Sequence, residues 1–278
     1  MSSPASRFTD PATHKATRGP VDQAVTLVPD AYRTDEFYEV ERDRVWSRSW
    51  VAVGYACQTP EAGDTLLVEV ADQPLILVRD RRGAIRCFHN VCRHRASRLL
   101  KEGGNCKVIR CGYHGWGYSL EGELLGTPFF QGLDVPREME DKFAIQPGTA
   151  ADFRKEDYPL LSVRCDTWAG IVFVNLDPNA MPLADWLGDL PQRYPRHPLD
   201  QLQLVRRKEY AIQANWKLIA ENFMEYYHLP WVTPSCATSR ASTTTGATRG
   251  PGCTRGCARA PSPKTRTRSS LTCRPTAG

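Results

Sequence analysis

Two short stretches decide the fold: NVCRHR at residues 90–95 and CGYHGWGY at residues 111–118. Each contributes one thiol and one imidazole, and sixteen residues separate the two pairs, which are Cys92 with His94 and Cys111 with His114. Turn residues lie around both stretches, so each pair is expected on a loop between short strands. Two matched loops that each carry a cysteine and a histidine indicate a metal centre.

A Rieske-type two-iron, two-sulfide cluster needs these ligands, because two cysteines hold one iron and two histidines hold the other. The neutral imidazoles remove negative charge and raise the reduction potential to roughly −150 to +300 mV. Zinc is the alternative, since it also accepts two cysteines and two histidines, but zinc fingers usually pair like ligands in each loop. The mixed pairs therefore favour the iron–sulfur cluster. Cys87, His89 and Cys106 lack the spacing and are expected to be packing or surface residues.

Short β segments surround these loops. Strands are expected at residues 50–54, 65–70, 74–78, 85–88 and within 160–176. Thr34 is expected to cap a short helix, and a further helix at 183–190 precedes a strand at 202–212. The predicted order is an N-terminal segment with a short helix (1–48), a mostly β domain (49–180), the start of a second domain (181–234) and a disordered tail (235–278).

The clearest helix in the sequence is expected at residues 215–229. Apolar side chains recur at helical spacing on a packing face made of Trp216, Ile219, Ala220, Phe223 and Tyr227. Glu221, Glu225 and His228 follow one another at intervals of four and three residues, so they line up on another face. Taken alone, His228 would be interpreted as a hydrogen-bonded histidine on this helix.

Composition limits the class of protein. The chain has 278 residues, of which 41% are hydrophobic and 24% charged, as in an ordinary globular protein. The net charge of +5 is weak support for nucleic-acid binding, because residues 235–278 carry no acidic residue and supply much of the excess. No export signal or membrane-spanning stretch is recognised, so the expected location is cytoplasmic and the ten cysteines are interpreted as thiols or ligands.

On these motifs the sequence resembles the Rieske non-haem iron oxygenases, the ring-hydroxylating oxygenase α subunits. The resemblance runs from about residue 27 to 231 and includes NVCRHR, CGYHGWGY, LEGEL at 120–124 and NWK at 215–217. Ala96 stands where glycine is common and Gly112 where proline is common, and neither is a ligand. The resemblance implies an α+β chain, in which a mostly β Rieske domain precedes the start of a helix-grip-like catalytic domain.

The same resemblance implies the roles of the site residues. Cys92, His94, Cys111 and His114 would hold the cluster, and Glu225 would bridge it to a mononuclear iron of a neighbouring subunit in a homotrimer. His228 would be the first iron ligand, and Asn222 belongs to the same catalytic helix. The second histidine is expected at position 233, where the sequence has Thr233, and no acidic residue follows Glu225 to supply the third ligand. The implied partners are an NAD(P)H-dependent reductase or ferredoxin, O2 and a small organic substrate.

One hypothesis for the broken motif is a shift of reading frame just before Thr233. Thr233-Pro-Ser-Cys can be encoded ACC-CCG-AGC-TGC, and reading one nucleotide earlier after a C gives His-Pro-Glu-Leu, which restores the ligand. The tail after residue 234 is rich in Ser, Thr, Arg, Pro and Gly and cannot bury enough apolar surface to fold. A genuine basic tail is the rival explanation, in which Cys253 and Cys257 form at most a weak metal motif.

Three functions remain open from the sequence. Glu225 at the bridging position, beside Tyr226 and Tyr227, favours the branch of the family that oxidises quaternary ammonium compounds. Aromatic-ring dihydroxylation is the alternative within the family. A stand-alone Rieske electron carrier is the alternative outside it, because the mononuclear iron site is incomplete in this sequence and the chain as given is expected to be inactive.

Overall fold

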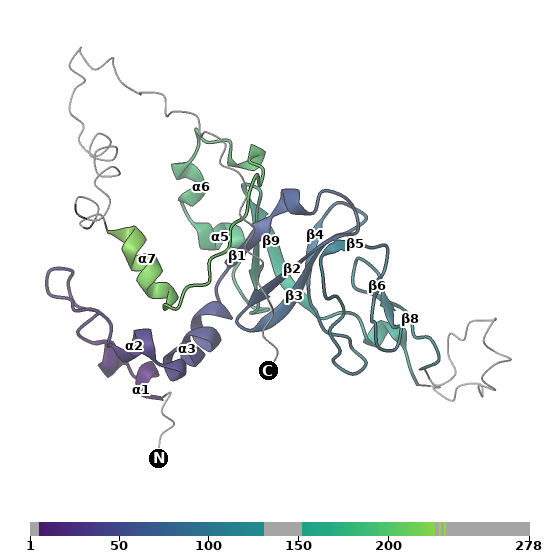
Figure 1. Cartoon of the computed structure of the whole chain (residues 1–278), viewed down its shortest axis with the longest axis horizontal. Coiled ribbons are helices and arrows are strands. Elements are labelled where there is room, and N and C mark those ends of the chain that lie inside the picture. The colour runs from purple at the N-terminus through teal and green to yellow at the C-terminus, as the bar shows by residue number, and fades with distance from the viewer. Residues whose placement is uncertain (1–5, 131–151, 226–227, 229–230, 232–278) are drawn as a thin grey trace, which may run out of the picture. The chain divides into compact units, whose positions relative to one another are not determined.

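The computed structural model describes residues 6–130, 152–225, 228 and 231 (Figure 1). The chain divides into two units, residues 1–219 and residues 220–278. The helices are α1 (Ser6–Thr9), α2 (Asp30–Arg33), α3 (Asp35–Glu41), α5 (Leu183–Leu187), α6 (Leu190–Arg193) and α7 (Trp216–Met224). Within the described residues, none of the helices has both the length and the apolar character needed to cross a membrane.

A seven-stranded antiparallel sheet forms the body of the first unit, in the order β1-β10-β9-β4-β3-β2-β5 (Figure 1). Its strands are β1 (Val51–Tyr55), β2 (Asp64–Val70), β3 (Gln73–Arg79), β4 (Ile85–His89), β5 (Gly104–Asn105), β9 (Ser162–Trp168) and β10 (Ile171–Asn175). Ala71 and Asp72 have positive φ angles, as the two central residues of a tight hairpin turn require, and this fixes the register of β2 against β3.

A second sheet of three short strands carries one of the two motif loops. Its strands are β6 (Ile109–Arg110), β7 (Gly117–Tyr118) and β8 (Leu124–Gly126), in that order. Trp116, Tyr118 and Phe88 are at most 2% exposed and share one apolar core with Cys92 and Cys111. The two cysteines therefore lie inside the packed part of the molecule and not on mobile surface turns.

Most of the strands expected from the sequence are present, within a residue or two of the predicted ends. Thr34 caps α3 as predicted, with its hydroxyl oxygen accepting from the N–H of Phe37 at 3.4 Å. The expected helix at 183–190 is wrong in extent. Gly188 has a φ of 56°, which ends α5, and α6 begins separately at Leu190.

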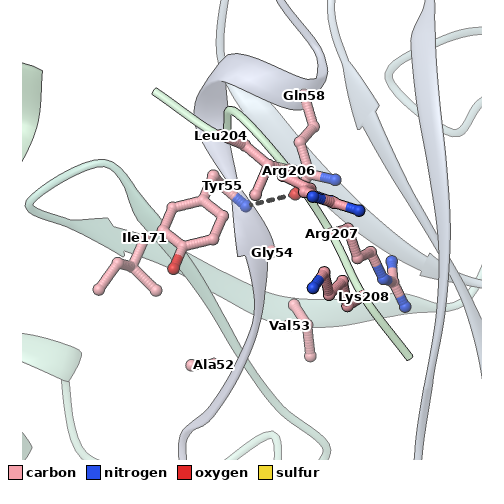
Figure 2. Close-up of a pocket in the computed structure, with 10 residues that line it drawn as sticks. All are labelled: Ala52, Val53, Gly54, Tyr55, Gln58, Ile171, Leu204, Arg206, Arg207 and Lys208. Atoms are coloured by element: carbon pink, nitrogen blue, oxygen red, sulfur yellow. Dashed lines mark hydrogen bonds between the residues drawn. The ribbon is translucent and has the colours of Figure 1, made fainter. Parts of the chain in front are cut away.

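The expected strand at 202–212 is also wrong, because the described chain has no strand there. The segment runs beside β1 (Figure 2). The N–H of Leu204 donates to the sulfur of Cys57, just after β1, at 3.4 Å. A strand needs a neighbouring strand to pair with its backbone N–H and C=O groups. The alternation of apolar and polar side chains along residues 202–212 does not supply that neighbour. The helix expected at 215–229 ends at Met224, earlier than predicted, although the N–H of Glu225 still donates to the carbonyl of Glu221. The predicted disordered tail lies outside the described residues.

Candidate iron–sulfur centre

Asn90 holds the first motif loop where it leaves β4. Its side chain is fully buried, its Oδ1 accepts from the N–H groups of Leu99 and Leu100 at 3.1 and 2.9 Å, and its Nδ2 donates to the Leu100 carbonyl at 2.8 Å. The N–H of Cys92 donates to the carbonyl of Ser97 at 2.8 Å. A buried amide whose donors and acceptors are satisfied closes the loop and fixes where Cys92 points.

The second loop joins β6 to β7 and is closed by its own backbone. The N–H of Cys111 donates to the carbonyl of Trp116 at 2.8 Å, and the N–H of Gly115 donates to the carbonyl of Cys111 at 3.1 Å. Gly115 has a φ of 73°, and a Cβ at this position would lie 3.4 Å from Pro128. Glycine is therefore favoured here by its backbone conformation, whereas a Cβ would only touch Pro128 at ordinary contact distance.

The two thiols are only 2% exposed and have different surroundings. Burial raises the pKa of the Cys92 thiol above its ordinary value. Burial acts in the same direction on Cys111, but N–H groups of Tyr113 and His114 donate to its sulfur and bring its pKa below the ordinary value. Backbone donors aimed at a buried sulfur stabilise a thiolate, which is the form that binds metals.

The two imidazoles meet directly. The Nδ1 atoms of His94 and His114 are 3.1 Å apart, and the His94 ring stacks on Trp116 with 4.8 Å between centroids and an interplanar angle of 7°. Burial, with the nearby His114 and Arg95, lowers the pKa of His94, which favours the neutral imidazole that a metal needs. A hollow of about 610 Å³ opens beside the pair and includes Arg95, Tyr113 and Phe130 in its lining.

The four side chains thus form a cysteine pair and a histidine pair. Two nitrogens that hold one metal at about 2.1 Å in tetrahedral geometry lie roughly 3.4 Å apart, close to the 3.1 Å of the Nδ1 pair. This donor set fits a two-iron cluster, with sulfur on one side and nitrogen on the other, better than one zinc ion.

Tyr118 completes the surroundings of the sulfur, a role that the sequence did not reveal. Its hydroxyl lies 3.4 Å from the sulfur of Cys92 and accepts from the N–H of Arg93 at 3.1 Å. Because that backbone donor occupies the oxygen, the phenol proton is free to point at the sulfur. The one available sign of a buried tyrosine was the alternation around it, because Trp116 and Leu120, two positions away on either side, are apolar and lie in the core.

The residues expected at the second iron site belong to the unit 220–278. Asn222 is exposed on α7, Glu225 follows the helix, and the Nδ1 of His228 contacts the Oε1 of Glu225. The structure therefore brings together the expected bridging carboxylate and the expected iron ligand of the same chain. Thr233, Tyr226 and Tyr227 lie outside the described residues.

Cys87 and Cys106 were expected to be packing or surface residues. Cys87 is 2% exposed in a core between β4, β9 and β10, and Cys106 packs against the core that contains the motif cysteines. A second hollow, of about 460 Å³, lies over β1 and is lined by the cations Arg206, Arg207 and Lys208 (Figure 2). Cationic side chains repel a metal ion, so this hollow is not a candidate metal site, and Arg207 is paired with Glu209 at 2.6 Å.

Two family models match the chain. The Rieske 2Fe–2S domain matches residues 49–137, and the ring hydroxylating alpha subunit (catalytic domain) matches residues 199–274. The second match continues through most of the segment predicted to be out of frame, and that prediction stays untested.

Similar proteins include the biphenyl dioxygenase subunit alpha of Metapseudomonas furukawaii, 34% identical over 78% of this chain and 47% of that protein. The glycine betaine monooxygenase oxygenase subunit of Pseudomonas aeruginosa is 29% identical over 74% of this chain and 44% of that protein. The quaternary ammonium Rieske monooxygenase CntA has a solved structure that superimposes with a TM-score of 0.65 at 28% identity, over 77% of this chain and 56% of that chain. The chain spans about half the length of these curated relatives. By its two matched domains and these relatives, the chain belongs to the Rieske non-haem iron oxygenase family of ring-hydroxylating α subunits.

Proposed function

We propose that the chain is the oxygenase α subunit of a Rieske system, in which Cys92, Cys111, His94 and His114 hold the two-iron cluster. The observation that carries this proposal is the 3.1 Å approach of the two Nδ1 atoms beside two buried cysteines. When bound, such a cluster accepts and passes on single electrons. The chain orients the His94 imidazole by stacking on Trp116, donates backbone N–H groups to the sulfurs, and buries the two cysteines away from water.

Electrons would come from a reductase or ferredoxin that docks near the histidine pair. Residues 93–110 carry six basic side chains and one acidic side chain. Tyr113 is 64% exposed, and its ring lies 3.9 Å from that of His114, centroid to centroid. A basic surface beside an exposed aromatic ring attracts an acidic partner and speeds its encounter.

We further propose that the mononuclear iron site is incomplete in this sequence. Glu225 and His228 occupy the bridging and first-ligand positions, but position 233 is a threonine, which does not replace an imidazole ligand. His228 alone does not make the usual three-ligand face of such an iron, and Glu225 is assigned to the bridge and not to the iron. Sequencing the genomic DNA beyond the Trp231 codon tests the frameshift: a histidine codon in another frame supports it, and an intact frame specifying Thr233 disproves it.

The substrate of the intact protein is proposed to be a small organic molecule that is hydroxylated or demethylated with O2, with a quaternary ammonium compound as first choice. Glu225 at the bridging position supports this choice, and one of the similar solved structures is a quaternary ammonium monooxygenase. Aromatic-ring dihydroxylation is the second candidate, because the biphenyl enzyme is similar over the same region. The proposed assembly is a homotrimer in the cytoplasm.

Oxygen uptake tests this proposal. The chain as sequenced, loaded with iron and supplied with a reductase and NADH, should consume no substrate-dependent O2, and a frame-restored chain should do so with carnitine or betaine. Uptake with biphenyl alone would favour the aromatic alternative. A frame-restored chain that holds about two irons and never consumes O2 would support the electron carrier instead.

A further inference from the structure

Helix α7 buries a charged side chain, although the apolar Leu218 beside it is 47% exposed. Its one buried residue is Lys217, which is 6% exposed. Apolar side chains gain free energy by burial and a lysine ammonium loses it. A specific interaction must therefore hold the charged side of this helix inwards.

That interaction is an ion pair with α3. The Nζ of Lys217 lies 2.8 Å from both carboxylate oxygens of Glu41, whose side chain is 8% exposed. The indole N–H of Trp216 donates to Oε2 of the same carboxylate at 3.3 Å. Rings of Phe37 and Tyr32 lie 5.0 and 5.6 Å from the ammonium, close enough for cation–π attraction.

The start of α7 is fixed at the same place. Asn215 caps the helix, and its Oδ1 accepts from the N–H of Lys217 at 3.1 Å. The Trp216 ring meets Trp46 edge to face at 4.9 Å. All three residues of the NWK motif thus take part in one joint, with Glu41 at its centre.

A buried ion pair adds little net stability, because removing two charges from water costs about as much as their attraction returns. In some proteins such pairs are retained because they select one arrangement over others. We propose that Glu41 is a positioning residue, which through Lys217 sets the rotation and register of α7. Glu221 and Glu225 follow Lys217 at intervals of four and eight residues. Residues at this spacing share a helix face, so a rotation of α7 at Lys217 would also change the direction of those two carboxylates. The anchoring stands by itself, and only its consequence for the iron ligands rests on the proposed function.

Hydrogen–deuterium exchange of the full chain tests this, with Glu41→Gln, Lys217→Met and the double variant E41L/K217M. Each single variant should speed exchange of the 217–224 amides about tenfold or more, because the remaining charge is left buried and unpaired. The double variant should recover the thermal unfolding midpoint of the unchanged chain, while its α7 amides still exchange rapidly. A positioning role predicts this difference between the two measurements, because an apolar pair restores packing but does not fix the rotation of the helix.

Arg42→Met is the matched control. Arg42 follows Glu41 directly and pairs with Asp72 at 3.3 Å on the surface, so its loss should leave α7 exchange unchanged. Unchanged exchange in β3 and β4 verifies that each variant is folded. The proposal is wrong if the double variant recovers stability and α7 protection together, or if neither single variant speeds α7 exchange. None of these readouts needs a loaded cluster or turnover, so failure here is distinct from failure of the proposed function.

Discussion

The Nδ1 atoms of His94 and His114 face each other at 3.1 Å, although sixteen residues separate the two loops that carry them. If both bind the same iron, losing either one should prevent cluster assembly. His114→Ala and Cys111→Ser should therefore reconstitute with almost no iron or sulfide. Iron and sulfide analysis of the purified variants is the measurement.

Two other cysteines provide matched controls for that experiment. Cys57 is exposed and Cys106 is half-buried, and neither belongs to the proposed ligand set. Cys57→Ser and Cys106→Ser should bind as much iron as the unchanged chain. Loss of the cluster in Cys106→Ser, with retention in Cys111→Ser, would show that the ligands have been assigned to the wrong thiols.

Tyr118→Phe should lower the reduction potential. A hydrogen bond to the Cys92 sulfur, across the 3.4 Å seen here, stabilises the reduced cluster because that form carries more negative charge. Losing about 1–2 kcal/mol of such stabilisation corresponds to roughly 40–90 mV for one electron. A potentiometric titration of both proteins measures the change, and an equal or higher potential in the variant would exclude this role.

Asp80→Asn should destabilise the chain in a pH-dependent way. Burial acts to raise the pKa of Asp80, but Arg86 and the N–H groups of Ala84 and Arg82 outweigh it and hold the pKa below the ordinary 3.8. A lowered folded-state pKa contributes stability above the unfolded-state value, and that contribution is lost as pH falls through the folded-state value. Since Arg86 is 40% exposed and solvent screens the pair, the expected loss at pH 7 is about 1–2 kcal/mol.

Urea unfolding at several pH values checks the sign of this effect. The difference between Asp80→Asn and the unchanged chain should be constant at neutral pH and shrink as the pH falls below about 4. A difference that grows at low pH would mean that the folded-state pKa is raised and that the interactions of Asp80 have been misjudged.

Ala96→Gly should stabilise the first motif loop. Ala96 has a φ of 53°, a left-handed conformation that costs a residue with a Cβ roughly 1–2 kcal/mol. Glycine removes that cost but gains entropy in the unfolded chain, so the net increase in unfolding free energy should be roughly 0.5–1 kcal/mol. Thermal unfolding compares the two proteins, and a lower midpoint in the variant would contradict the assigned strain.

Arg95→Glu should slow electron transfer from an acidic donor. Arg95 is exposed and lines the hollow beside the histidine pair. Reversing its charge should lower the second-order rate about tenfold at low salt, and the difference should fade as salt screens the charges. Arg82→Glu, at the other end of β4, is the control with the same charge change. Equal effects in the two variants would point to net charge and not to a docking site.

The sequence predicted the β domain well because its signals are local. Alternating apolar residues and turn residues such as Asp80–Gly83 specify strands and hairpins without help from distant parts of the chain. Cys92, His94, Cys111 and His114 were recognisable for the same reason, since each loop carries its ligands a few residues apart.

What the sequence did not show depends on partners far along the chain. The segment 202–212 alternates like a strand, yet it forms none because β pairing needs a neighbour. Glu41 and Lys217 are 176 residues apart, and no local pattern marks a charge that will be buried. Tyr118 shows a similar limit, because its contact with Cys92 is made only when β7 packs under the first loop.

Iron and sulfide content, together with the reduction potential, tests the central claim most directly. Reconstituted full-length chain should hold about two irons and two sulfides and show a reversible one-electron potential between roughly −150 and +300 mV. A colourless protein that takes up one zinc ion, or a cluster with a potential near that of an all-cysteine ferredoxin, at about −400 mV, would contradict ligation by His94 and His114.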